Sequence, residues 1–124
     1  MKNEASVERS EQLREPERAI FNFHCPPHGT TLDVAPKLDA DLRPMLNGAD
    51  VLMAPAGSLA TRRTIERFQP IVSLHGHIHE SRAAQKLGRT MCFNPGSEYS
   101  EGVLRGVLME FKPNKLKGWQ FTNG

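Results

Sequence analysis

The sequence predicts an α/β fold, because two short apolar runs flank a segment with the pattern of an amphipathic helix. The apolar runs, residues 19–24 and 71–74, have the length of buried strands. Residues 59–68 lie between them and place apolar side chains near one helical face. Strand, helix and strand in this order favour a parallel crossover. After residue 82 the chain has antiparallel character.

The predicted helix has a recognisable start and stop. Ser58 stands at the capping position, and Pro70 ends the segment. Two less regular stretches precede this helix. Residues 39–46 are a weak helix candidate that contains Pro44, and residues 49–53 are an apolar run of ambiguous type.

The two parts of the chain on either side of residue 18 differ in character. Residues 1–18 hold nine charged residues, and we expect a charged tail or a fraying helix that Pro16 limits. Residues 19–124 are expected to form the domain. Within it, residues 82–85 and 90–94 flank a predicted turn.

The C-terminal part predicts two further strands. Residues 103–111 alternate in polarity, and residues 116–122 follow a Pro-Asn turn. The segments 19–24, 71–74 and 103–111 are apolar enough for burial on both faces of a sheet.

Composition excludes several classes of protein. The 124 residues are 38% hydrophobic and 24% charged with a net charge of +2, which is ordinary for a globular domain. No basic cluster indicates nucleic acid as a partner, and no run approaches the roughly 18 apolar residues of a membrane span. The first residues lack the apolar core of a signal peptide. We therefore expect a cytoplasmic protein whose two cysteines are reduced.

All histidines of the chain stand at a predicted strand end or in the loop after one: His24, His28, His75, His77 and His79. Ligands of open α/β sheets bind outside the carboxyl ends of strands. Along an extended stretch His77 and His79 point the same way, and Gly76 allows a sharp bend or a close approach to a ligand. Because imidazole is the commonest metal ligand, this pattern indicates a metal site.

Two alternatives use the same residues. A His-x-His pair after a strand is often a polar loop, and His24, His28 or His75 can each be a hydrogen-bonded structural residue. A zinc site of Cys25, His28, Cys92 and one more histidine would have four ligands of suitable type.

Three stretches point to a known family: FNFHCPPHGTTLD at 21–33, SLHGHIHES at 73–81 and NPGSEYSEGVLRG at 94–106. Together they resemble the C-terminal half of bacterial calcineurin-like metallophosphoesterases. The Gly-His-Ile-His signature is moderately specific alone, and the stretches on both sides make it strong. The resemblance covers roughly residues 17–111.

The resemblance implies a binuclear metal centre that hydrolyses phosphate esters. In the family, the histidines matching His24 and His77 bind one metal, and the histidine matching His79 binds the other. A hydroxide between the metals attacks phosphorus, and the metals neutralise the developing charge. Imidazole ligands suit Mn, Fe or Zn better than Mg or Ca. The fold implied for this chain is the C-terminal half of the family's α/β/β/α sandwich of two sheets.

The family's first half is not matched. It carries Asp-x-His, Gly-Asp and Asn-His motifs, none of which occurs here, and no Asp or His precedes His24. We therefore interpret the chain as truncated, with three metal ligands and no catalytic histidine, and expect it to be inactive alone.

Two kinds of partner follow from this interpretation. We expect the chain to form a homo-oligomer or to bind a partner that supplies the missing half. The alternatives are a non-catalytic metal-binding or regulatory module and one subunit of a split phosphoesterase.

Overall fold

The computed structural model describes residues 4–124, with side chains from residue 8 onward. Its elements, in chain order, are α1 (Glu4–Glu11), η1 (Pro16–Arg18), β1 (Ile20–Asn22), β2 (Val34–Pro36), β3 (Leu46–Asn47), β4 (Asp50–Val51), β5 (Met53–Pro55), α2 (Leu59–Phe68), β6 (Val72–Leu74), β7 (Ala83–Leu87), β8 (Thr90–Asn94), η2 (Tyr99–Glu101), β9 (Arg105–Lys112) and β10 (Lys115–Asn123). The structure is a mixed α/β protein with a small mixed sheet and few helices, which is the class that the sequence predicts.

The central sheet has four strands in the order β1-β6-β8-β7. Strands β1, β6 and β8 are parallel, with Ile20 opposite Val72 and Val72 opposite Met91, whereas β7 is antiparallel to β8. The predicted parallel crossover is therefore confirmed, and α2 lies in the connection between β1 and β6. The carboxyl ends of the three parallel strands meet at one edge of the sheet.

Helix α2 has the predicted bounds because both of its ends are stabilised locally. The Ser58 hydroxyl accepts a hydrogen bond from the backbone N–H of Thr61 at 3.1 Å, as an N-cap does. At the other end Gln69 adopts a left-handed conformation with φ 49°, and its N–H donates to the Ile65 carbonyl. Pro70 follows and prevents a further turn.

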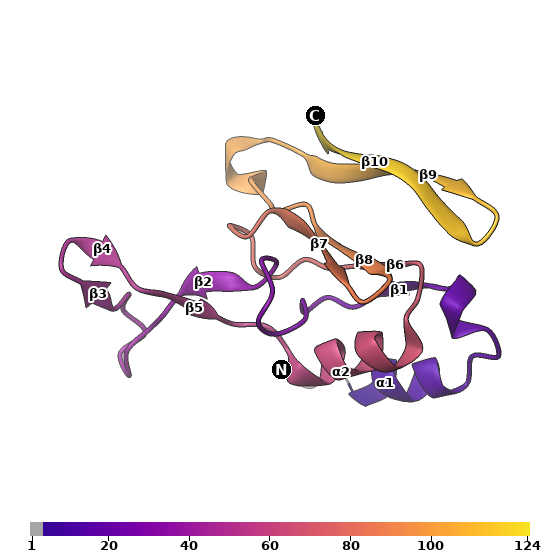
Figure 1. The fold of residues 1–124 in the computed structure, drawn as a ribbon. Coiled ribbons are helices and arrows are strands. Elements are labelled where there is room, and N and C mark those ends of the chain that lie inside the picture. Colours follow the sequence, from indigo (N-terminus) through magenta and orange to yellow (C-terminus); the bar gives the residue numbers. More distant parts are fainter. Residues whose placement is uncertain (1–3) are drawn as a thin grey trace.

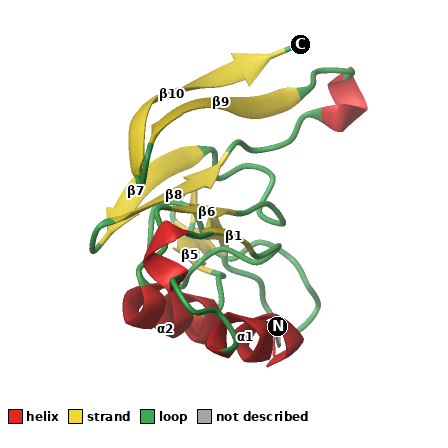
Figure 2. Cartoon of the chain, turned by 90° about the vertical axis from the view of Figure 1, so that its right-hand side faces the viewer, coloured by secondary structure: helices red, strands yellow, loops and turns green. Residues whose placement is uncertain are grey.

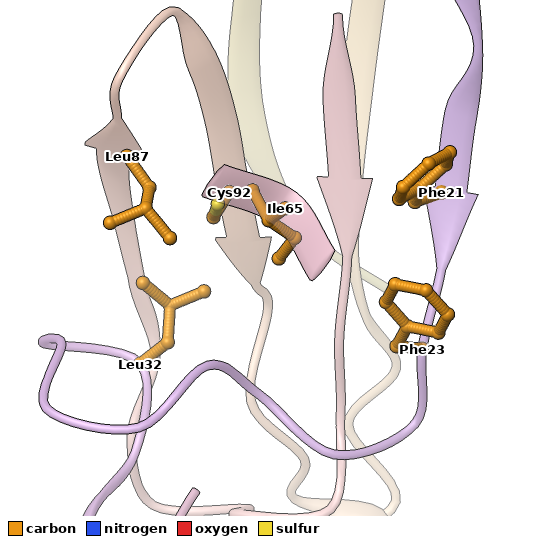
Figure 3. Packing of buried hydrophobic residues seen from close by; sticks show 6 residues of the cluster. All are labelled: Phe21, Phe23, Leu32, Ile65, Leu87 and Cys92. Carbon is orange, nitrogen blue, oxygen red and sulfur yellow. The ribbon is translucent and has the colours of Figure 1, made fainter. Parts of the chain in front are cut away.

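The main hydrophobic core lies between the central sheet and α2. Figure 3 shows its members: Phe21, Phe23, Leu32, Ile65, Leu87 and Cys92. Helix α1 packs beside α2 below this core (Figure 1), and an ion pair of 2.7 Å joins Arg67 to Glu11. Residues 1–3 of the predicted tail lie outside the described residues. Helix α1 ends before Pro16, which begins η1. No helix of residues 4–124 is long and apolar enough to cross a membrane.

The β9–β10 hairpin forms a third layer over the opposite face of the sheet (Figure 2). Trp119 and Phe121 of its inner face contact Phe93 of β8, with ring centroids 5.0 Å and 6.4 Å away. The expectation that residues 103–111 are buried on both faces is wrong. Leu104 and Leu108 are 75% and 60% exposed, because this two-stranded hairpin covers the sheet with one face only.

A narrow arm, residues 34–55, projects from the body (Figure 1). It consists of two small antiparallel pairs, β2 with β5 and β3 with β4. The predicted helix at 39–46 is absent from this described arm. Leu42 adopts φ 61° there, and the Met45 N–H donates across the arm to the Lys37 carbonyl at 2.7 Å. The hydrogen bonds and backbone angles of residues 39–46 are therefore those of a strand-like arm. A helix is also disfavoured here because Pro44 has no N–H to donate.

Candidate metal-binding site

The imidazoles of His24 and His77 lie side by side at the carboxyl ends of two adjacent parallel strands. Their ring centroids are 5.1 Å apart, and the ring planes meet at 71°. The pairing of β1 with β6 continues past the strands, because the Phe23 N–H donates to the Leu74 carbonyl and the Gly76 N–H to the His24 carbonyl, each at 3.0 Å. Both side chains are exposed to solvent. The backbone ladder thus holds two imidazoles next to each other at this end of the sheet.

The segment after β6 is a tight turn and not an extended stretch. His77 has φ 62°, and the Ile78 N–H donates to the Gly76 carbonyl at 2.7 Å. The left-handed residue of this turn is His77, so the bend does not depend on the conformational freedom of Gly76. The other part of the expectation, that Gly76 allows a close approach to a ligand, stays a prediction. The alternation that would place His77 and His79 on one side does not hold in a turn of this kind.

His79 therefore has different neighbours. Its ring lies 5.7 Å from the ring of Tyr99, at 89°, and not in a group with the other two histidines. Among residues 8–124, no three side chains of His, Cys, Asp or Glu come close enough together to hold one metal ion. The structure therefore pairs His24 with His77 and leaves His79 at a separate position.

Asn94 fixes the turn that carries the histidines. Its side-chain amide donates to the carbonyls of Ile78, at 2.9 Å, and Leu32, at 3.1 Å, and its Oδ1 accepts from the Gly96 N–H. The Ser97 N–H donates to the His79 carbonyl at 3.0 Å. The Asn-Pro-Gly-Ser loop thus positions the backbone on both sides of the His77–His79 turn.

His75 is a buried structural residue, as one of the sequence alternatives had it. Its Nδ1 atom lies 2.9 Å from the Phe23 carbonyl and 3.2 Å from the Cys25 carbonyl, the two residues that flank His24. Its Nε2 atom is buried without a hydrogen-bond partner among the described residues. Burial lowers the pKa of His75 to about 4, so the ring is neutral near pH 7.

The residues of the alternative zinc site do not converge. Cys25 and Cys92 are both free and buried, and burial raises the pKa of each thiol, that of Cys92 to about 12. A thiol that stays protonated is a poor metal ligand. His28 is half-buried, and its carbonyl accepts from the Arg62 guanidinium at 2.9 Å.

A cavity of about 780 Å³ lies beside His79. Its lining includes Tyr99, two arginines and three glutamates: Arg82, Arg105, Glu80, Glu98 and Glu101. Glu98 pairs with Arg105, whereas Arg82 lies over the Phe121 ring, 4.6 Å from its centroid. The Arg82 guanidinium has no carboxylate partner among residues 8–124 and can accept an anion.

Sequence reasoning missed Asp33, which organises the loop after His24. Its buried carboxylate accepts hydrogen bonds from the backbone N–H groups of Gly29, Thr30 and Gly57, each at 2.9 Å. Any side chain at Gly57 would collide with the Pro26 carbonyl and with Asp33 itself. The Gly-Thr-Thr-Leu-Asp spacing, which lets an Asp side chain cap preceding N–H groups, was the available signal.

Comparison with known proteins gives one informative similarity. Over 74 residues the chain is 35% identical to the uncharacterized protein MJ1162 of Methanocaldococcus jannaschii, and the alignment covers 58% of this chain. The chain spans only 28% of the length of that protein. No family model and no solved structure matches the chain.

Proposed function

We propose that this chain carries the C-terminal ligands of a metal-dependent phosphoesterase. The observation that supports this most directly is the 5.1 Å separation of the His24 and His77 rings at the ends of adjacent parallel strands. It is the pair that the family resemblance implies for one ion. The same resemblance implies that His79 binds a second, different ion. The position of His79 beside Tyr99, away from the other two histidines, agrees with this assignment.

The donor set suits a divalent transition metal such as Mn, Fe or Zn. His24 and His77 would hold it through neutral imidazoles. When bound, such an ion supplies a Lewis acid that activates water and neutralises phosphate charge. Two imidazoles leave further coordination positions for groups that come from elsewhere, in keeping with a chain that lacks the family's carboxylate motifs.

Within the mixed-charge cavity beside His79, Arg82 is the cation that a phosphate ester would meet. A phosphate ester carries charge that the Arg82 guanidinium can neutralise, and the phenol of Tyr99 offers a hydrogen bond. In this proposal His24 and His77 orient the metal, while Arg82 orients the phosphate.

The fold we propose is half of an α/β/β/α sandwich. Helices α1 and α2 cover one face of the central sheet, and the β9–β10 hairpin would be part of the second sheet. The outer edge of β1 is unpaired within residues 4–124, and its Ile20 is half exposed. An edge of this kind favours the split-phosphoesterase form of the proposal, in which another segment completes the fold.

The proposal predicts that a phosphate ester binds more tightly when metal is present. Methyl phosphate should bind the Mn-loaded chain about tenfold more tightly than the EDTA-treated chain, a difference of about 1.4 kcal/mol. Calorimetric titration measures both affinities. The increment should disappear in His77→Ala and persist in His28→Ala, the matched control. A chain that binds Mn yet shows no increment contradicts the proposal.

Turnover is the second half of this test. Hydrolysis of bis(4-nitrophenyl) phosphate with Mn should stay near the rate of Mn alone, because the described residues offer no carboxylate beside the histidine pair. Clear turnover that His79→Ala abolishes would show that the chain, or a homodimer of it, builds a complete site. The claim that the chain is inactive alone would then be wrong.

A further inference from the structure

A second cavity lies at the opposite end of the parallel strands from the histidines. Its volume is about 560 Å³, and it is an open hollow bordered by β7, β8 and the turn end of the β9–β10 hairpin. Ile71, directly before β6, and Met91, near the start of β8, are part of its lining. His24 and His77 follow the carboxyl ends of their strands. The cavity is therefore separate from the proposed metal site.

The lining of this cavity is strongly basic, whereas the chain as a whole is nearly neutral. Lys86, Arg89, Lys115 and Lys117 line it, and no acidic side chain of the described residues does. Because the whole chain carries +2, the residues outside the cavity together carry −2. Lys86 and Lys115 have no ion-pair partner among residues 8–124. Lys117 pairs with the exposed Glu110, a contact that is weak in water.

The cavity also has an aromatic wall. Trp119, the one tryptophan in the sequence, is 39% exposed and rests edge-on against Phe93 and Phe121. Those two contacts hold the indole in place without covering all of it. Ile71, Met91 and Leu116 add apolar surface. A ligand that fits must therefore combine an anionic part with a flat apolar part.

We propose that this cavity binds a nucleoside phosphate, with the base against Trp119 and the phosphate among the lysines. The volume is within the roughly 300–1,000 Å³ of small-molecule sites. Proteins that bind single-stranded nucleic acids without sequence preference use the same chemistry. An aromatic side chain stacks on the base, and cationic side chains contact the phosphate. This inference is independent of the phosphoesterase proposal, since neither His24 nor His77 takes part.

Trp119 reports binding directly, because no other tryptophan contributes to the fluorescence of the chain. Titration of the full chain with adenosine 5′-phosphate should quench this fluorescence in a saturable way, and added salt should weaken the binding. Adenosine and inorganic phosphate should each bind at least about tenfold more weakly, since each lacks one half of the recognised chemistry. Equal binding of inorganic phosphate, or no quenching by the nucleotide, overturns the proposal.

The recognised group is either a free nucleotide or a nucleotide within a nucleic-acid strand, and a single-stranded oligonucleotide distinguishes between them. Binding of the oligonucleotide at least about tenfold more tightly than the mononucleotide would identify a nucleotide within a strand as the ligand. Equal or weaker binding would identify the free nucleotide. Both results require the base and the phosphate to act together in this cavity.

Charge reversal tests the location. Lys86→Glu and Lys115→Glu should each lower the affinity for adenosine 5′-phosphate at least about tenfold, and circular dichroism checks that both variants fold. Lys112→Glu is the matched control, because Lys112 pairs with Lys115 across the hairpin but does not line the cavity. A loss in Lys112→Glu as large as in Lys115→Glu contradicts the site.

Discussion

His75 joins the two loops that carry the paired histidines. Its Nδ1–H group lies between the carbonyls of Phe23 and Cys25, so it holds the backbone on both sides of His24 against the end of β6. His75 is itself two residues from His77. The separation of the His24 and His77 rings therefore depends on a buried imidazole that stays neutral.

The buried imidazole makes stability depend on pH. In the unfolded chain His75 has an ordinary pKa near 6.5, whereas burial lowers the folded value to about 4. The unfolded state thus binds more protons between these values, and the free energy of unfolding falls as the pH decreases from about 6.5 to 4. The full effect is roughly 3 kcal/mol. Denaturant midpoints of the EDTA-treated chain between pH 7 and 4.5 measure it.

The variant His75→Asn provides the control. An asparagine amide can donate to the same carbonyls but does not titrate, so its stability should vary less with pH over this range. Parallel pH profiles for the two proteins would mean that His75 does not carry the effect.

The sequence allowed prediction of which histidines lie at strand ends but not of how each is oriented. His24 and His77 lie together because parallel strands end at a common edge, a rule that needs no coordinates. The left-handed φ of His77 could not be anticipated, because Gly76 was the residue expected to accept such a conformation. This left-handed residue interrupts the alternation that would have placed His77 and His79 on one side.

At the scale of the element, α2 and the arm show opposite degrees of predictability. Helix α2 has its cap at Ser58 and its stop at Pro70 in the local sequence, so its bounds were predicted correctly. The arm has only two- and three-residue strands that pair with one another. The pairing of β2 with β5 joins residues about twenty positions apart, which local patterns do not reveal.

The arm exposes several large apolar side chains to solvent, which is energetically unfavourable. Leu42 and Leu46 are 76% and 64% exposed, and Leu38, Val51 and Met53 are also exposed. We predict that the chain associates through this arm, because hiding a few hundred Å² at about 25 cal/mol per Å² contributes several kcal/mol. Light scattering after gel filtration should show a mass above that of a monomer.

Substitutions on the arm test that prediction. Leu42→Lys with Leu46→Lys should shift the protein towards the monomer, whereas Ala40→Lys adds charge to the same arm and removes only one methyl group. A wild-type chain that is monomeric at every concentration, or an equal shift in the Ala40 variant, would count against association through the arm.

At the scale of the whole molecule, the parallel core was predictable and the layering was not. The order strand, helix, strand predicted that β1 and β6 are parallel. Residues 103–111 and 116–122 were predicted as strands, but their alternation does not say which sheet they join. The contacts of Trp119 and Phe121 with Phe93 place them as a separate layer.

The layers also separate the two candidate sites. The histidine pair lies at the carboxyl ends of the parallel strands, and the basic cavity lies at their amino ends, where Ile71, Met91 and residues of the hairpin line it. Binding at one site therefore need not obstruct the other. The cavity went unnoticed in the sequence because its four cations lie in two segments that only the folded layers bring together.

Cobalt titration of the metal-free chain, followed by calorimetry and by visible absorption, tests the histidine pair most directly. We predict at most one ion per chain, bound weakly and lost on dialysis. His24→Ala and His77→Ala should each weaken binding at least about tenfold, while His28→Ala should not. Two tightly held ions per chain, or equal effects of the His77 and His28 substitutions, would contradict the account.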